Sequence, residues 1–341
     1  MANNNFNTKK NHAKVSSLNN SEYVSGILKG DRSILSRAIT LIESKNPNHH
    51  NSADELISSC LPHSGKSFRL GITGVPGVGK STFIESFGLM LIEKGFKVAV
   101  LAIDPSSGRS KGSILGDKTR MSKLASNKSA FIRPSPSSDT FGGVERKTRE
   151  SIVLCEAAGY DFIIVETVGV GQSEIAVKSM VDFFLLLLLP GAGDELQGIK
   201  RGIVEMADLM LINKSDGDSK KLANKARLDY KNALHLFPPS NSGLEVKVLT
   251  CSAIEKTGLD AVIKNLEHYK SQITESGYLK TQRQKQNEYW LTESLFDTLK
   301  TDFLNNTSIK TKLEELKSDV SFGKISPFKA SEILIGLYKN S

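Results

Sequence analysis

Short apolar runs alternate with longer amphipathic segments along most of the chain. Seven runs of four to nine mostly apolar residues are typical of strands buried in a core. These runs span residues 68–72, 97–103, 130–133, 161–165, 181–189, 208–212 and 245–250. Between several of them, apolar side chains recur at helical spacing, as at Phe83, Phe87 and Leu91. Strands that alternate with helices predict an α/β fold with a doubly wound, mostly parallel sheet.

The same pattern divides the chain into four parts. Residues 1–20 are rich in Asn, Ser and Lys, and we expect a disordered tail there. Residues 21–62 predict an N-terminal helical segment, with a polar connector over 46–52. Residues 63–272 contain the seven strands and form the α/β domain, and residues 273–341 form a C-terminal helical extension.

The C-terminal extension carries an apolar stripe at helical spacing. Its members are Leu291, Leu295, Phe296, Leu299 and Phe303, and Trp290 lies beside them. One interpretation is that the stripe packs on its own domain. The other is that it forms a homodimer arm, because so short an extension has little core of its own.

Composition and charge exclude several classes of protein. The net charge of +8 suits an anionic partner, and nucleotide phosphate or an acidic protein surface would satisfy it. No basic stripe interleaved with aromatic residues is present, which argues against nucleic acid. The three cysteines are scattered and suit a reducing cytosol, and the first twenty residues lack the pattern of a signal or transit peptide. The longest apolar run is too short to span a bilayer, so we expect a cytoplasmic protein without a membrane partner.

The segment after the first predicted strand matches the phosphate-binding P-loop pattern G-x-x-x-x-G-K-S. It lies between a strand and a helix N-terminus, where backbone N–H groups and the helix dipole favour a phosphate. We expect Lys80 to reach the β- and γ-phosphates and the Ser81 hydroxyl to bind Mg²⁺. The predicted nucleotide-binding residues here are Gly74, Val75, Pro76, Gly77, Val78, Gly79, Lys80, Ser81 and Thr82.

Two acidic residues that follow predicted strands are candidates for the metal. Asp104 ends the strand over 97–103 and is placed to hold Mg²⁺ directly or through water, although it could also be a turn or helix-capping residue. Glu166 follows the strand over 161–165, in the layout of a Walker B strand and a D-x-x-G element with Glu in place of Asp. The Glu166 carboxylate would hold a Mg²⁺-bound water, and the Gly169 N–H would sense the γ-phosphate.

Three polar, glycine-containing segments are typical of nucleotide switch loops. One covers residues 108–120, one follows Glu166, and one covers residues 190–200. Many small GTPases have a catalytic Gln directly after the glycine of the second loop, but this chain has Val170 there and Gln172 two residues later. We therefore predict slow intrinsic hydrolysis until a rearrangement orients the attacking water.

The strand over 208–212 leads into N-K-x-D, the guanine-reading element of GTPases. The Asp216 carboxylate can accept hydrogen bonds from guanine N1–H and its amino group, and adenine offers neither donor. Asn213 would brace the P-loop, and the stem of Lys214 would pack on the base. Ser252 and Ala253 follow the last strand and match the S-A element that contacts the guanine oxygen.

These motifs, with the segments between them, resemble the methylmalonyl-CoA mutase-associated GTPases, the MeaB/ArgK-like family of P-loop GTPases. The resemblance runs from about residue 23 to the C-terminus and is densest over residues 70–217. Besides the P-loop and N-K-x-D, it is carried by residues 102–107, 112–121, 131–138, 142–144, 165–174 and 189–200. Asp139, Phe141 and Ser215 depart from the family pattern, but none falls on a predicted ligand position.

The resemblance implies roles that the motifs alone leave open. It implies that Asp104, Asp117 and Glu166 surround the metal together with Ser81. It assigns Asp194 and Lys200 to a third switch that transmits partner binding to the nucleotide site. The expected catalytic residues are then Lys80, Glu166, Gly169, Asp194 and Lys200.

The family also implies a chaperone function with GTP or GDP and Mg²⁺ as cofactors. Such proteins bind an adenosylcobalamin-dependent mutase, gate cofactor delivery by an adenosyltransferase, and protect or reactivate the mutase. The mutase stimulates their GTP hydrolysis, and the C-terminal extension forms a homodimer. Residues 63–272 are then the G domain.

Three alternatives remain at this point. A nickel metallochaperone GTPase would need a Cys/His cluster, and His49–His50 in a polar connector is the single His pair. An ATP-driven kinase linked to amino-acid transport conflicts with Asp216, which selects guanine. A passive module would bind nucleotide without turnover.

Overall fold

The structure is a computed structural model that describes residues 18–44, 46–103, 121–134, 141–167, 173–191 and 201–340. The chain divides into two compact units. The first contains the residues up to Gly65 together with Glu150–Gly159, and the second contains Lys66–Arg149 and the residues from Tyr160 onward.

The first unit is helical, with α1 (Asn20–Leu28), α2 (Arg32–Ile42) and α3 (His50–Cys60), and the short 3₁₀ helices η1 (Pro47–His49) and η2 (Leu61–His63). Asn19 begins α1 through a capping box with Glu22, and the Asp31 side chain caps α2. The prediction of a polar connector over residues 46–52 is wrong for its last residues, which belong to a helix. Asn46 caps η1, and that turn continues directly into α3 at His50.

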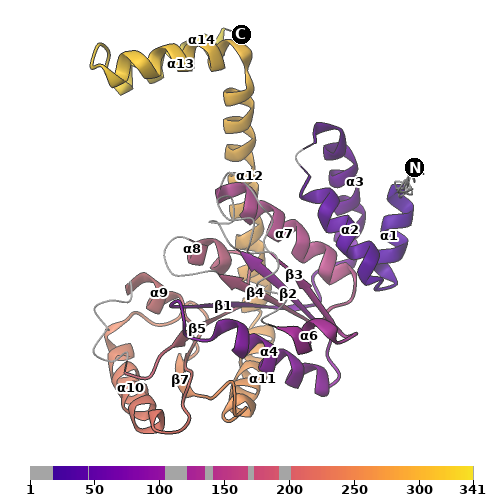
Figure 1. The fold of residues 1–341 in the computed structure, drawn as a ribbon, viewed down its shortest axis with the longest axis vertical. Coiled ribbons are helices and arrows are strands. Elements are labelled where there is room, and N and C mark those ends of the chain that lie inside the picture. Colours follow the sequence, from indigo (N-terminus) through magenta and orange to yellow (C-terminus); the bar gives the residue numbers. More distant parts are fainter. Residues whose placement is uncertain are drawn as a thin grey trace, which may run out of the picture. The chain divides into compact units, whose positions relative to one another are not determined.

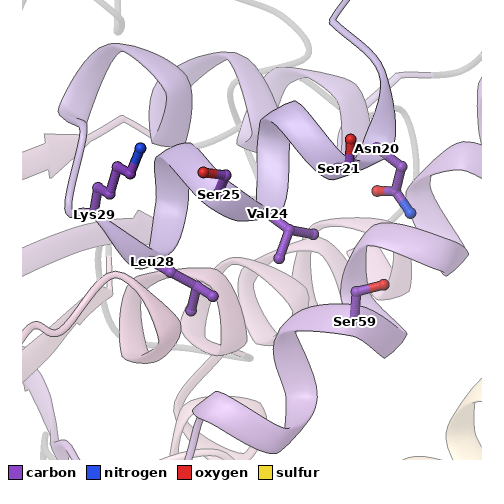
Figure 2. A pocket seen from close by; sticks show the side chains of 7 residues that line it. All are labelled: Asn20, Ser21, Val24, Ser25, Leu28, Lys29 and Ser59. Atoms are coloured by element: carbon purple, nitrogen blue, oxygen red, sulfur yellow. The ribbon is translucent and has the colours of Figure 1, made fainter.

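An open pocket of about 720 Å³ lies on the first unit (Figure 2). Its lining consists of five residues of α1, Lys29 directly after that helix, and Ser59 of α3. Every residue of the nucleotide site predicted from the sequence belongs to the second unit. None of the residues predicted for the nucleotide site lines this pocket.

The described part of the second unit contains one seven-stranded sheet in which every pair of neighbours is parallel (Figure 1). The strands are β1 (Phe68–Gly74), β2 (Val98–Ile103), β3 (Ala130–Arg133), β4 (Phe162–Thr167), β5 (Phe183–Leu188), β6 (Leu209–Ile212) and β7 (Lys247–Thr250). Their order is β3-β2-β4-β1-β5-β6-β7, so the P-loop strand β1 is central. This confirms the doubly wound, parallel sheet expected from the sequence.

The described helices of this part are α4 (Lys80–Glu93), α6 (Ser122–Ser126), α7 (Phe141–Ala157), α8 (Ser173–Lys178), α9 (Arg201–Met206), α10 (Ser219–Ala233), the 3₁₀ helix η3 (Leu234–Leu236) and α11 (Leu259–Glu275). Helix α7 begins in the second unit and ends in the first. The C-terminal extension forms α12 (Tyr278–Asn305), α13 (Thr307–Ser321) and α14 (Pro327–Lys339).

Two apolar cores cover the two faces of the sheet. In β5, Leu185 and Leu187 belong to the core with α4 and α11, whereas Leu186 and Leu188 belong to the core with α9 and α10. Successive side chains of a strand point to opposite faces, so a strand covered on both sides must be apolar at every position. The unbroken apolar run in β5 therefore follows from its place inside the sheet.

Asp182 was expected within a strand over 181–189, but β5 begins at Phe183. The Asp182 carboxylate is fully buried at the amino end of the strand. It accepts a hydrogen bond from the backbone N–H of Arg69 at 2.8 Å and is paired with the Arg283 guanidinium at 2.6 Å. A buried carboxylate needs such partners, so Asp182 joins β1 to the C-terminal extension instead of continuing the apolar run.

Helix α12 has one face against the α/β domain and another that faces solvent. Trp290 is 6% exposed, whereas Leu291 is 73% and Phe296 is 60% exposed. Glu145 of α7 is buried, and the nearby carboxylates of Glu293 and Asp297 in α12 act on it electrostatically. No helix in the part of the chain that the structure describes is long and apolar enough to cross a membrane.

Candidate nucleotide site

The loop between β1 and α4 owes its shape to glycines. Gly77 and Gly79 have φ angles of +80° and +92°, in the left-handed region that glycine adopts without strain. A Cβ on Gly79 would lie 2.8 Å from Nδ2 of Asn213, and a Cβ on Gly74 would lie 2.6 Å from the carbonyl oxygen of Leu187. The loop thus passes close to β5 and Asn213, and it leads into the N-terminus of α4, where a phosphate is favoured.

Lys80 is held by the loop that it follows. Its Nζ donates to the carbonyl oxygen of Gly74 at 2.6 Å and to that of Val75 at 3.4 Å. Burial lowers the pKa of Lys80, and the carboxylates of Glu166 and Glu174 act in the opposite direction. An ammonium held by two carbonyls in this position can exchange them for phosphate oxygens.

The other predicted P-loop residues differ in exposure. Val78 is buried against the core, whereas Pro76 and Thr82 are exposed. Ser81 follows Lys80 in the first turn of α4 and is half-buried. The loop therefore presents its backbone to the outside while Val78 fixes it to the domain.

Ser81 and Glu166 meet at the carboxyl edge of the sheet. The Ser81 hydroxyl donates to Oε1 of Glu166 at 3.3 Å, and Glu166 is only 5% exposed. Next to it, the Thr167 hydroxyl donates to the Thr73 hydroxyl at 2.8 Å, which joins the ends of β4 and β1. A hydroxyl and a carboxylate are hard oxygen ligands, and Mg²⁺ usually takes one or two protein oxygens with phosphate and water. These two residues therefore fit the metal that the sequence predicts.

Asn213 connects the two halves of the predicted nucleotide site. Its Nδ2 donates to the carbonyl oxygen of Val78 at 2.9 Å, and its Oδ1 accepts from the backbone N–H of Ala253 at 3.2 Å. The Cys251 thiol is 3.5 Å from the same oxygen, and burial raises the pKa of that thiol to about 12. One side chain, 2% exposed, thus links the P-loop to the loop after β7.

Asp216 is oriented by the loop that follows β7. Its Oδ2 accepts a hydrogen bond from the hydroxyl of the fully buried Ser252 at 2.5 Å. The backbone N–H of Glu255 donates to the same hydroxyl at 3.1 Å and so fixes its direction. Lys214 has a φ of +57°, which turns the chain between Asn213 and Asp216. The structure thus brings together the N-K-x-D and S-A elements, which are far apart in the sequence.

Five of the predicted site residues lie outside the described residues: Asp104, Asp117, Gly169, Asp194 and Lys200. Val170 and Gln172, on which the prediction of slow hydrolysis depends, lie outside them as well. The metal-binding and catalytic roles given to these residues stay predictions. Among the described residues, no three His, Cys, Asp or Glu side chains are close enough to share a metal ion.

The structure adds two side chains that the sequence did not single out for this site. Glu174, in the first turn of α8, is only 3% exposed and lies within electrostatic reach of Lys80. Ser86 of α4 donates to the carbonyl oxygen of Ala253 at 2.7 Å and so ties the loop after β7 to the P-loop helix. Spacing could not reveal either contact, because each joins segments that are distant in sequence.

Comparison with known proteins agrees with this geometry. The family model described as methylmalonyl Co-A mutase-associated GTPase MeaB matches residues 35–308. GTPase ArgK of Escherichia coli is 50% identical over 270 residues, which are 79% of this chain and 82% of that protein. The mouse mitochondrial methylmalonic aciduria type A homolog is 45% identical over 325 residues, covering 92% of this chain and 78% of that protein.

A solved structure described as LAO/AO transport system kinase is similar to nearly the whole chain. The two structures superimpose with a TM-score of 0.75 at 38% sequence identity. The match covers 95% of this chain and 100% of the solved chain. The relatives named as GTPases agree with an enzyme that hydrolyses GTP, and the resemblance seen in the motifs is confirmed. The chain belongs to the methylmalonyl Co-A mutase-associated GTPase MeaB family.

Proposed function

We propose that this GTPase is a chaperone of an adenosylcobalamin-dependent acyl-CoA mutase, with methylmalonyl-CoA mutase as its client. It would hydrolyse GTP to gate loading of the cofactor from an adenosyltransferase and to protect or reactivate the mutase. The observation that carries the proposal is the match of most of the chain to a family described as mutase-associated. The relative named after methylmalonic aciduria supports the same client.

The arrangement of the site indicates how the nucleotide would be held. Asp216, oriented by Ser252, would accept the N1–H and amino donors of guanine. Lys80 would exchange its two loop carbonyls for phosphate oxygens. Ser81 and Glu166 would hold Mg²⁺, with Asp104 and Asp117 completing its surroundings. A bound Mg²⁺ would neutralise charge that develops on the phosphates.

Hydrolysis in the presence of the client tests the proposal. We expect purified methylmalonyl-CoA mutase to raise the turnover of GTP by at least about tenfold, equivalent to about 1.4 kcal/mol of barrier. Lys80→Ala should abolish both basal and stimulated turnover, because no other described cation contacts the P-loop carbonyls. Lys94→Ala, at the exposed end of the same helix, is the matched control. Turnover that is unchanged by the mutase would contradict the proposed client.

The second candidate is a kinase linked to amino-acid transport, which the description of the similar solved structure favours. It differs from the first in its nucleotide, because a kinase of that type would use ATP. Competition by ATP and GTP for bound GDP separates the two. Tight binding of ATP with weak binding of GDP would remove the GTPase chaperone and leave the kinase.

We also propose that residues 63–272 act as the G domain and that residues 273–341 form a homodimer arm. The support is the apolar face of α12, on which Leu291, Leu295, Phe296 and Leu299 are each at least 50% exposed. An exposed apolar stripe of this length is a feature of interaction surfaces. We propose that the protein is located in the cytoplasm, because a reducing compartment suits its free, buried cysteines.

Sedimentation of variants with a charge in this face tests the dimer. Leu295→Asp should shift the protein from dimer to monomer, because a buried carboxylate without a partner opposes association. Lys300→Asp, at an exposed polar position of the same helix, should leave the dimer intact. A wild-type protein that sediments as a monomer at micromolar concentration would contradict the proposed arm.

A further inference from the structure

Helix α8 is a short helix that comes soon after β4 in the chain. Strand β4 ends at Thr167, and α8 begins at Ser173, so residues 168–172 connect the strand that carries Glu166 to this short helix. The helix packs tightly on β1. A Cβ on Gly71 would lie only 2.9 Å from Val177 and 3.0 Å from Val181. Gly71 therefore lets α8 and the turn after it approach the strand that leads into the P-loop.

The first turn of α8 lies close to the phosphate-binding lysine. Glu174 is 3% exposed, and its carboxylate acts to raise the pKa of the half-buried Lys80 ammonium. A charge pair in a poorly solvated site interacts more strongly than one in water. A nucleotide whose γ-phosphate engages Lys80 would therefore change the electrostatic environment of α8 as well.

Helix α12 donates hydrogen bonds to the end of α8 and to the turn that follows it. Gln286 donates from Nε2 to the carbonyl oxygen of Val181 at 2.7 Å and to that of Lys178 at 3.4 Å. The Trp290 indole N–H donates to the carbonyl oxygen of Ser179 at 3.1 Å. The last carbonyls of a helix have no partner within it. Two side chains of α12, each 6% exposed, thus supply donors to carbonyls at the end of α8 and in the turn after it.

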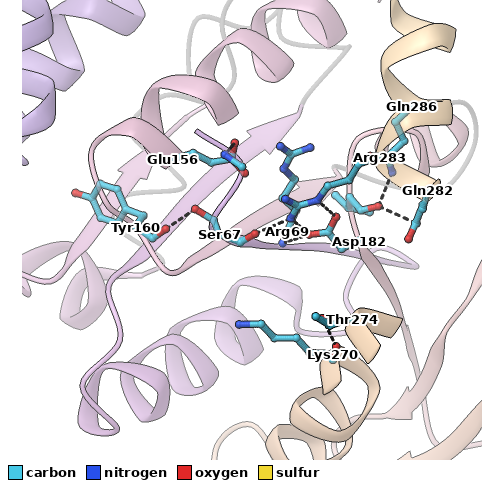
Figure 3. Close-up of polar contacts among 12 residues, drawn as sticks. Ser67, Arg69, Glu156, Tyr160, Asp182, Lys270, Thr274, Gln282, Arg283 and Gln286 are labelled. Atoms are coloured by element: carbon cyan, nitrogen blue, oxygen red, sulfur yellow. Dashed lines mark hydrogen bonds and ion pairs between the residues drawn. The ribbon is translucent and has the colours of Figure 1, made fainter. Parts of the chain in front are cut away.

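The first turns of α12 are fixed to the sheet by Arg283, through contacts that do not involve α8. Arg283 donates from Nε and Nη2 to the two oxygens of the buried Asp182 at 2.8 and 2.6 Å, and Nη2 also reaches the carbonyl oxygen of Ser67 at 2.6 Å (Figure 3). A bidentate pair of this type fixes both position and orientation. A shift of the backbone over residues 178–181 relative to α12 would therefore change the contacts of Gln286 and Trp290.

We propose that Gln286 and Trp290 are positioning residues for GTP hydrolysis, which hold the end of α8 and the turn after it, residues 178–181, and couple α12 to the nucleotide state. The physical chain runs from the P-loop along β1, through the close packing of Gly71 on Val177 of α8, to these two donors. The charge of Glu174 at the start of α8 acts on Lys80 beside this path. The exposed apolar face of α12 begins at Leu291, directly after Trp290. Occupation of that face would therefore act on the same contact. The proposal depends on the GTPase activity and not on the identity of the client.

The chain contains a single tryptophan, so Trp290 is its own fluorescent reporter. Its emission, excited selectively, is compared in the full-length protein loaded with GDP and with a non-hydrolysable GTP analogue. Calorimetry on the same samples verifies that each nucleotide is bound. We expect the emission to differ between the two states, because the indole hydrogen bond to Ser179 changes when α8 moves.

Two variants distinguish positioning from simple support of the fold. Gln286→Leu removes the amide donor, and Gln284→Leu makes the same change at an exposed position of α12. In Gln286→Leu we expect the emission change to fall to less than half and kcat to fall at least about fivefold, with KM and GDP affinity within about twofold of wild type. Gln284→Leu should behave as wild type. Trp290→Phe keeps an aromatic ring but lacks the N–H, and its kcat should fall by a similar factor.

Two results would overturn the proposal. The first is identical Trp290 emission in the GDP and GTP-analogue states of a protein that binds both. The second is a Gln286→Leu variant that retains the wild-type emission change and kcat, even if its resistance to denaturant is reduced. In the second case the contacts between α12 and α8 would support the fold alone.

Discussion

Asn213 offers a sharp test of how the nucleotide site is assembled before nucleotide binds. Its amide nitrogen faces the carbonyl oxygen of Val78 at 2.9 Å, and its oxygen faces the N–H of Ala253 at 3.2 Å. Both partners are buried, so Asn213→Ala leaves a donor and an acceptor without their bonds. Each lost bond costs about 1–2 kcal/mol when its partner stays buried. The free energy of unfolding of the nucleotide-free protein should therefore fall by about 2–4 kcal/mol.

The same substitution should also weaken GDP binding. Without Asn213, the P-loop and the loop after β7 are no longer held in register, and only a fraction of molecules has the binding-competent arrangement. A competent fraction of about one tenth would raise the apparent Kd of GDP about tenfold. Denaturant unfolding measures the first effect and calorimetry the second.

A matched control separates the side chain from the loop that carries it. Ser215 lies in the same loop, and its backbone N–H donates to the carbonyl oxygen of Cys251 at 2.9 Å, a bond that Ser215→Ala retains. That variant should behave as wild type in both assays. If Asn213→Ala stays within about 0.5 kcal/mol in stability and about twofold in GDP affinity, the bridging role is refuted.

Three further outcomes follow from single contacts. Burial and the acidic side chains of α12 raise the pKa of Glu145 from 4.5 to about 7. Between these pH values the folded state keeps a proton that the unfolded state loses. The free energy of unfolding should therefore fall by up to about 3 kcal/mol as the pH rises from 4.5 to 7. Glu145→Gln should remove this slope in denaturant unfolding. Ser252→Ala removes the donor to Asp216 and should weaken GDP about tenfold while leaving ATP binding unchanged in calorimetry. Gly258→Ala places a Cβ 2.4 Å from the carbonyl oxygen of Thr250 at a φ of +78°, so its thermal unfolding temperature should drop by several degrees.

Local patterns in the sequence were sufficient to predict the strands. Every predicted strand is present, because a strand buried on both faces needs apolar side chains at every position, as in β5. The strand order, with β1 between β4 and β5, was not predicted. It depends on crossover connections, which leave no local pattern in the sequence.

The site shows the same division between local and distant information. The P-loop and N-K-x-D could be recognised from the sequence because each is a short segment whose residues act together. The hydroxyl of Ser252 on Asp216 and the carboxylate of Glu174 near Lys80 could not be read, since each joins positions that are far apart in sequence. The sequence placed Trp290 beside the apolar stripe but gave it no partner. Its indole N–H donates to the carbonyl oxygen of Ser179, directly after α8, while its neighbour Leu291 faces solvent.

The central claim is that guanine nucleotide in this site controls cofactor loading of a partner mutase. The most direct measurement is the rate at which adenosylcobalamin passes from an adenosyltransferase to cofactor-free methylmalonyl-CoA mutase, with this protein and either GTP or ATP present. We predict that GTP changes the rate in the presence of the wild-type protein, and that ATP or the Lys80→Ala variant does not. A rate that is independent of the protein, or one that ATP changes as much as GTP, would contradict the claim.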